Sequence, residues 1–257
     1  MANGPYWDEG LMLGNGDAPQ ILALGDSWFW YPLNNLLIPI WNLWAGDKDI
    51  LAQGKVGAEA AELATGSYLK NFRRLLKGYP GIRAVLISAG GNDFAGLDDM
   101  SAILNPKNIC ENASTGKECF DAGKLNQLMF GTVVDSYRTI IDEVDAHRGE
   151  ALVFMHNYDY AVPSGIGFFG FGQWLKYPMD QAGVPSTVQP LAVNYLLDTF
   201  NDALAQIHYE YADRTILIDS SGALAATDWA NELHPNMHGF NKIVQRAWQK
   251  QLLDNLL

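Results

Sequence analysis

The sequence predicts an α/β protein in which a parallel β-sheet is covered by helices on both faces. Short apolar runs alternate along the chain with long amphipathic stretches, which is the pattern that such a layered arrangement produces. The apolar runs are continuous, as expected of strands that are buried on both faces. With 257 residues, 48% of them hydrophobic and 18% charged, the chain can bury a sizeable core.

Five apolar runs are predicted to form the strands of the sheet. They are residues 20–24 (QILAL), 49–53 (DILAQ), 83–88 (RAVLIS), 151–156 (ALVFMH) and 215–219 (TILID). Four longer stretches carry apolar residues at three- and four-residue steps, which is typical of amphipathic helices. They are residues 57–78, 124–147, 190–211 and 238–254. We therefore expect a parallel sheet of about five strands with helices between them.

No internal repeat or linker divides the chain, so we expect a single domain over residues 1–257. Two long loop insertions interrupt the pattern, near residues 97–122 and 160–188. The first contains Cys110 and Cys119, which are too few for a disulfide scaffold and lack the partners of a zinc site. A local disulfide between them and a pair of free thiols are both compatible with the sequence.

The charge balance excludes several classes of partner. The chain carries 29 acidic and 17 basic side chains, a formal net charge of -12, and its sequence pI is near 4.7. Recognition of nucleic acid depends on Lys and Arg displacing the counterions of phosphates, so we expect no nucleic-acid partner. For the same reason an anionic membrane surface is not expected as a partner.

No transmembrane segment is expected, although residues 28–46 run without a charge. Pro32, Pro39 and three asparagines interrupt this stretch, and they would break a helix or leave amides unpaired in lipid. No basic region followed by an apolar region begins at Met1, so no signal peptide is expected in this chain. We expect a soluble protein, either cytoplasmic or secreted after processing.

Glycines and polar side chains follow the predicted strands, where an open parallel sheet binds its ligands. These segments are Gly25-Asp26-Ser27, Gly54-Lys55-Val56-Gly57, Gly90-Gly91-Asn92-Asp93, His156-Asn157-Tyr158-Asp159 and Asn231-Glu232-Leu233-His234-Pro235. Such a set suits acyl transfer. Ser27 is the candidate nucleophile, and His234 is the candidate base that a serine hydroxyl needs for activation. The backbone N–H groups of Ser27 and Gly57 and the side-chain amide of Asn92 are candidate donors to a tetrahedral oxyanion.

Four of these blocks resemble, in order and placement, the signature blocks of the SGNH (GDSL-type) hydrolase family. They are Gly25-Asp26-Ser27, Gly57, Gly90-Gly91-Asn92-Asp93 and His234-Pro235. The resemblance implies a flavodoxin-like, three-layer α/β/α fold and a serine ester hydrolase, of the esterase or lipase kind, that uses no metal ion or other cofactor. It carries the nucleophile role to Ser27, the base to His234, and the oxyanion hole to Ser27, Gly57 and Asn92. The implied substrate is a small-molecule, lipid or glycan ester.

One position departs from the family pattern. Family members usually have an aspartate three residues before the histidine, and this chain has Asn231 there. Replacing the acid of a serine triad with its amide can cost about four orders of magnitude in rate. Glu232, Asp228, Asp159 or a backbone carbonyl are the alternatives for orienting His234. We favour a site that works as a dyad, because every other block is intact.

Three other functions compete with this interpretation. The missing aspartate alone favours a catalytically impaired binding protein on the same scaffold. A carbohydrate O-acetyl esterase would use the same residues as a lipase. A metallophosphoesterase is disfavoured, because the chain lacks an Asp-x-His motif near its first strand and a second set of histidine ligands.

Aromatic residues near the candidate catalytic residues suggest an apolar substrate pocket. Trp28 follows Ser27 directly, and Phe168 and Phe169 lie in the second insertion. We expect these three side chains at the pocket and the uncharged stretch of residues 28–46 as the main wall for the acyl group.

Overall fold

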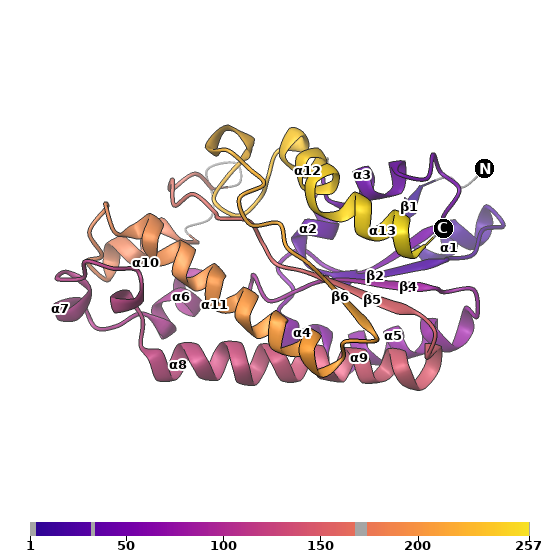
Figure 1. The fold of residues 1–257 in the computed structure, drawn as a ribbon, viewed down its shortest axis with the longest axis horizontal. Helices are drawn as coiled ribbons and strands as arrows, with labels where there is room; N and C mark the ends of the chain where they lie inside the picture. Colours follow the sequence, from indigo (N-terminus) through magenta and orange to yellow (C-terminus); the bar gives the residue numbers. More distant parts are fainter. Residues whose placement is uncertain (1–3, 32–33, 168–173, 257) are drawn as a thin grey trace.

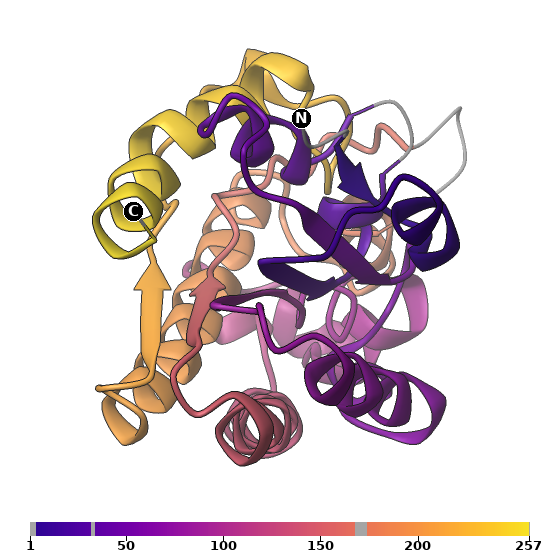
Figure 2. The ribbon, with the colours of Figure 1, turned by 90° about the vertical axis from the view of Figure 1, so that its right-hand side faces the viewer.

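The computed structural model describes residues 4–31, 34–167 and 174–256, and these residues form one parallel sheet of six strands between two layers of helices (Figures 1 and 2). The strands are β1 (Pro5–Tyr6), β2 (Ile21–Gly25), β3 (Ile50–Gly54), β4 (Ala84–Ser88), β5 (Leu152–His156) and β6 (Thr215–Ile218). Their order is β1-β3-β2-β4-β5-β6. Without the two-residue β1, this is the order 2-1-3-4-5 of flavodoxin-like sheets. The predicted fold is confirmed.

Each predicted strand lies within one residue of its expected bounds. All five residues of β2 and all five of β4 are buried, which explains why their sequences are continuously apolar. The sixth strand, β1, was not predicted, because two residues are too short to show a periodicity. It pairs in parallel with Ile50 and Leu51 at the edge of the sheet.

The helices form a layer on each side of the sheet. One layer contains α5, α9 and α11, and the other contains α3, α12 and α13 (Figure 1). The α-helices are α1 (Glu9–Gly14), α2 (Ser27–Trp30), α3 (Leu37–Asn42), α4 (Ala60–Leu63), α5 (Gly66–Gly78), α6 (Leu97–Ile103), α7 (Lys107–Cys110), α8 (Ala122–Asn126), α9 (Val134–Arg148), α10 (Lys176–Gln181), α11 (Gln189–Glu210), α12 (Met237–Ile243) and α13 (Gln249–Asn255). Short 3₁₀ turns lie at Lys117–Cys119 and Ala226–Asp228, and π-helical segments at Gln127–Val133 and Val244–Trp248.

All four predicted helices are present, with different internal structure. The helix expected at 190–211 is α11, but the one expected at 57–78 is divided into α4 and α5. The stretches at 124–147 and 238–254 each contain a π-helical segment between two α-helices. π-helical segments are rare interruptions inside α-helices, and the approximate three- and four-residue spacing of apolar side chains does not distinguish them from an uninterrupted α-helix.

The two long insertions have local structure of their own. Residues 97–122 include α6 and α7, and an antiparallel bridge joins Leu104 to Phe120. Cys110 and Cys119 are both buried and both free, so the local disulfide is not formed. Residues 160–188 include α10. Across the described ranges, no helix is long and apolar enough to cross a membrane.

Candidate active site

Ser27 lies at the carboxyl edge of the sheet, at the start of α2. Gly25 at the end of β2 is opposite Gly54 of β3 and Ser88 of β4, so three strands end together beside the serine. Gly54 has a φ of +137°, and a Cβ atom there would lie 1.8 Å from the carbonyl oxygen of Gly25. Asp26 caps α2 by accepting a hydrogen bond from the Trp28 N–H at 3.0 Å. The glycines therefore permit the close approach of strands that the serine turn requires.

His234 faces Ser27 from a loop 207 positions later in the chain. Its Nε2 lies 2.8 Å from the Ser27 Oγ, and its Nδ1 lies 3.0 Å from the Asn231 Oδ1. The loop turns back on itself, because Ala230 N–H donates to the His234 carbonyl at 2.8 Å. The indole N–H of Trp28 donates to the Leu233 carbonyl at 3.0 Å and ties α2 to this loop. The serine, the histidine and the asparagine thus form one hydrogen-bonded chain.

The orientation of the Asn231 amide determines which nitrogen of His234 carries the proton. Its Oδ1 accepts backbone N–H bonds from Leu233 and His234, both at 2.9 Å, so the oxygen must point toward the ring. A carbonyl oxygen only accepts hydrogen bonds, so Nδ1 must be the protonated nitrogen and Nε2 the bare one. This is the tautomer in which Nε2 accepts the Ser27 hydroxyl proton.

The three carboxylates considered as alternatives to Asn231 are used elsewhere. Glu232 accepts backbone N–H bonds from Gly165, Leu175 and Lys176 at 2.8–3.1 Å. Asp159 accepts from the N–H groups of Gly222 and Leu224, both at 2.6 Å. Asp228 pairs with the Lys242 ammonium at 2.7 Å and accepts from the Ala225 N–H at 2.8 Å. In each case the carboxylate holds a loop rather than the histidine ring.

Burial keeps His234 neutral. The side chain is 4% exposed, and burial lowers its pKa to about 4. The Tyr31 ring is stacked on the imidazole with 4.2 Å between centroids and 12° between planes. Trp174 meets the same ring edge-on, with centroids 6.0 Å apart. The histidine is therefore a free base over most of the pH range in which the protein would be assayed.

The three candidate oxyanion donors lie in different settings. The Ser27 N–H is in the first turn of α2, where a helix offers no internal acceptor. Asn92 lines the same cavity as Ser27, and its amide donates to the Ala58 carbonyl at 3.0 Å. Gly57 has a φ of +77° and lies exposed in the turn after β3. It directly precedes Ala58, whose carbonyl accepts the hydrogen bond from the Asn92 amide.

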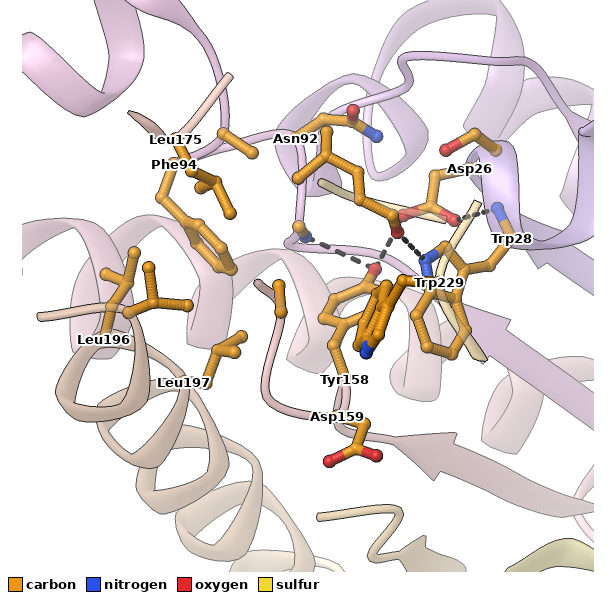
Figure 3. Close-up of a pocket in the computed structure, with 16 residues that line it drawn as sticks. Asp26, Trp28, Asn92, Phe94, Tyr158, Asp159, Leu175, Leu196, Leu197 and Trp229 are labelled. Carbon is orange, nitrogen blue, oxygen red and sulfur yellow. Dashed lines mark hydrogen bonds between the residues drawn. The ribbon is translucent and has the colours of Figure 1, made fainter. Parts of the chain in front are cut away.

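A buried network behind Ser27 was not predicted. The Asp26 carboxylate accepts from the Tyr158 hydroxyl at 2.6 Å (Figure 3). It also accepts from the Ser88 hydroxyl at 2.8 Å. Burial raises the pKa of Asp26 to about 6, against the effect of these hydrogen bonds. Tyr158 also accepts from the Gly91 N–H at 3.3 Å. The network fixes the serine turn to the loops after β4 and β5.

A cavity that is partly open to solvent lies beside Asp26, Asn92 and Tyr158 (Figure 3), and Ser27 is among the residues that line it. Its apolar walls are Trp28, Phe94, Ala95, Tyr158, Ala161, Leu175, Val193, Leu196, Leu197, Trp229 and Leu233. The prediction that residues 28–46 form the main wall is wrong, because among the described residues of that stretch only Trp28 lines the cavity. Leu37 and Ile40 are buried in α3 instead. Phe168 and Phe169 lie outside the described residues.

His156 is a second buried histidine, enclosed by Trp28, Tyr158 and Trp248 with ring centroids 5.3 Å away. Its Nδ1 is 2.6 Å from the Asn157 carbonyl, its Nε2 has no hydrogen-bond partner, and burial lowers its pKa to about 4. As the pH falls from about 6.5 to 4, His156 becomes protonated in the unfolded chain but stays neutral in the folded protein, so the free energy of unfolding decreases.

Replacing His156 with phenylalanine is expected to remove this loss. When the pH is lowered from 8 to 5, the free energy of unfolding of the wild type should fall by about 2 kcal/mol more than that of His156→Phe. Burial raises the pKa of Asp26 to about 6 and that of Asp93 to about 7. These two shifts increase the free energy of unfolding as the pH falls, but they are present in both proteins and cancel in the comparison. Urea unfolding at the two pH values measures the difference, and parallel pH dependence of the two proteins would contradict it.

A metal centre was not expected at this site. Within residues 4–31, 34–167 and 174–256, no group of three or more His, Cys, Asp and Glu side chains is arranged to hold a metal ion. His238 lies 3.9 Å from Asp228 but is 73% exposed in its side chain.

Known protein structures share this fold. The lipase Lip_vut3 from a goat rumen metagenome superimposes with a TM-score of 0.58 and 14% identity, over 93% of this chain and 98% of that chain. The extracellular lipase of Streptomyces rimosus gives 0.55 and 15%, over 90% and 100%. A protein of Parabacteroides merdae described as a GDSL-like lipase gives 0.52 and 12%, over 89% and 94%. The chain has the SGNH hydrolase fold.

At these identities the similarity concerns the fold alone. No family model matches the chain, and no curated protein sequence matches it. The parallel sheet of this chain brings the segments that follow β2, β3 and β4 to one edge. Ser27 lies directly after β2, at the start of α2, Asn92 follows β4, and His234 lies in the segment before α12.

Proposed function

We propose that the protein is a metal-independent serine hydrolase that cleaves carboxylic esters through an acyl-enzyme on Ser27. The observation that carries the proposal is the 2.8 Å contact between the Ser27 Oγ and the His234 Nε2. Nucleophile and base at this distance, with the base oriented by a third group, are the arrangement that covalent acyl transfer requires. Asn231, with its oxygen 3.0 Å from the His234 Nδ1, is the third group.

The reaction has two halves. In the first, His234 Nε2 takes the Ser27 proton as the Oγ bonds to the ester carbonyl carbon, and it then gives that proton to the alcohol oxygen as the C–O bond breaks. In the second, His234 Nε2 takes a proton from water as the water oxygen bonds to the acyl carbon, and it then gives that proton to the Ser27 Oγ as the bond between the acyl carbon and Oγ breaks, which releases the acid and restores Ser27. The Ser27 N–H, the Gly57 N–H and the Asn92 amide are the proposed donors to the oxyanion, each typically worth about 3–4 kcal/mol in the transition state.

The acyl group is proposed to be apolar and uncharged. The cavity beside Ser27 is walled by aliphatic and aromatic side chains, and its two carboxylates are engaged in buried hydrogen bonds. An acyl chain would bury its methylenes there at about 0.8 kcal/mol each. A charged acyl group would have no partner in the described walls.

Covalent labelling and a substrate panel test the proposed function. A fluorophosphonate should add its mass to Ser27, and p-nitrophenyl esters should be hydrolysed at the same rate with and without a chelator. If Ser27 is not labelled and no ester is cleaved, the protein is the impaired binding protein. If activity requires a metal ion, the metallophosphoesterase is favoured instead. An acetylated glycan belongs in the panel, because preference for it over octanoyl and butyryl esters would identify an O-acetyl esterase.

Filling or enlarging the cavity is expected to shift chain-length preference in opposite directions. Ala161→Phe should lower the ratio of kcat/KM for octanoyl over acetyl esters by about tenfold or more, because about two to three methylenes of the octanoyl chain can no longer be buried in the cavity. Leu196→Ala, which removes a fully buried wall of α11, should raise the same ratio. Both variants are compared with Ala205→Phe, an exposed position on the same helix. An unchanged ratio in both cavity variants would mean that the acyl group binds elsewhere.

A further inference from the structure

The neutral Asn231 leaves one requirement of the proposed mechanism unmet. When His234 accepts the Ser27 proton it becomes an imidazolium in a buried site, where a positive charge is costly. A triad aspartate would offset that charge, and an amide oxygen carries only a partial one. Some other group beside the ring is needed to stabilise the cation.

The titratable groups packed around His234 do not supply a carboxylate. From its own loop, Glu232 is bound to three backbone N–H groups. From the turn before α2, Asp26 is bound to Ser88, Tyr158 and Trp28. From the segment before α12, Asp228 is paired with Lys242. Burial is the cause of the lowered pKa of His234, with no charged neighbour contributing among the described residues.

The Tyr31 ring covers one face of the imidazole. The two centroids are 4.2 Å apart and the planes differ by 12°, which is within the range at which an aromatic face attracts a cation. Such an attraction grows when the pair is desolvated, and His234 is 4% exposed. The interaction is weak with the neutral ring and strong with the imidazolium, so it favours the protonated form.

Hydrogen bonds to the orienting amide and to the serine contribute to holding the tyrosine in this position. Its hydroxyl accepts from the Asn231 amide Nδ2 at 3.2 Å, and its backbone N–H donates to the Ser27 carbonyl at 2.6 Å. Asn231 therefore binds the histidine through its oxygen and the tyrosine through its nitrogen. Tyr31 is also the residue that ends α2, one turn after the serine that begins it. Nucleophile, base, orienting amide and aromatic ring form one closed cluster.

We propose that Tyr31 is a positioning residue that stabilises the imidazolium of His234 through its aromatic face and so replaces part of the function of the absent aspartate. The proposal rests on the proposed serine hydrolase function. The imidazolium forms when the proton leaves the Ser27 Oγ for Nε2, and it disappears when the proton passes to the alcohol oxygen. Tyr31 exchanges no proton and makes no bond to the substrate.

Activity measurements on Tyr31→Leu and Tyr31→Phe give the first test. Leucine keeps an apolar cover without an aromatic face, and it should lower kcat for a p-nitrophenyl ester about tenfold with little change in KM. Phenylalanine keeps the face and should stay within about threefold of the wild type. In the Asn231→Asp background the effect of Tyr31→Leu should shrink, because a carboxylate then offsets the charge. Equal kcat for the leucine and phenylalanine variants would overturn the proposal.

A titration of His234 by NMR gives a second test that does not depend on activity. Tyr31→Leu should lower the pKa of His234 below its value in Tyr31→Phe, because the protonated ring loses its aromatic partner. Tyr209→Leu, at a position 86% exposed, is the matched control and should leave the pKa unchanged. The same pKa in the leucine and phenylalanine variants would reject the role of Tyr31. Absence of labelling at Ser27 would reject the hydrolase function, and the titration would still decide whether Tyr31 stabilises the cation.

Discussion

Replacing Ser27 with alanine is expected to lower kcat for ester hydrolysis by roughly six orders of magnitude, while the protein stays folded. The Oγ atom is the proposed nucleophile that bonds to the acyl carbon. Without it, His234 has no hydroxyl group to deprotonate. The side chain is 5% exposed and small, so its loss leaves the Asp26 cap and the strand ends in place. Steady-state hydrolysis of p-nitrophenyl butyrate measures the rate, and circular dichroism checks the fold.

The matched control for this variant is Ser186→Ala, an exposed serine before α11. It should keep the wild-type rate and the wild-type mass shift with a fluorophosphonate. Retention of more than about 1% of the activity by Ser27→Ala would exclude Ser27 as the nucleophile, since residual catalysis by an oxyanion hole alone is far weaker.

Replacing Asn231 with leucine is expected to lower kcat by about a thousandfold, because the amide oxygen selects the tautomer of His234. Without it, Nδ1 loses its acceptor and the ring is free to carry the proton on Nε2, where it cannot accept from Ser27. The N–H groups of Leu233 and His234 would also lose their acceptor, at about 1–3 kcal/mol for each one left unsatisfied. The rate is measured at a temperature where the variant is still native.

Asn231→Asp is the companion variant and should act in the opposite direction. The carboxylate can accept the same three N–H groups and also the Tyr31 hydroxyl, and it adds the charge that stabilises an imidazolium. We expect an increase in kcat of about tenfold and a rise in the pKa of His234. If the aspartate variant shows no gain or a loss, another group orients the histidine.

The fold was predictable because it depends on features that are local in sequence. Continuous apolar runs marked five strands to within one residue, and periodic stretches marked the long helices. Strand β1 and the short helices near residues 27–42 left no such signal, because two to six residues do not complete a pattern. The division of residues 57–78 into two helices is also invisible to periodicity. The single-domain interpretation stays a prediction.

The site was predictable only where short motifs carry it. The blocks containing Ser27, Asn92 and His234 lie at one edge of the sheet, as expected of residues that follow parallel strands. Tyr158 and Tyr31 were not identified, since their roles depend on contacts across 132 and 203 positions of chain. The alternative carboxylates were chosen because they lie close to His234 in sequence, as Glu232 and Asp228 do, or follow a strand at the same edge of the sheet, as Asp159 does. In the structure each of them accepts hydrogen bonds from backbone N–H groups instead of from the histidine ring. The catalytic roles themselves stay predictions.

The Glu232 carboxylate couples the segment that carries His234 to two other described parts of the chain. It accepts the N–H of Gly165 on one side and those of Leu175 and Lys176 on the other, at a position two residues before His234. Removing a buried acceptor leaves each of its donors unsatisfied, at about 1–3 kcal/mol for each one. The position of the base therefore depends on a side chain that touches neither the imidazole nor the serine.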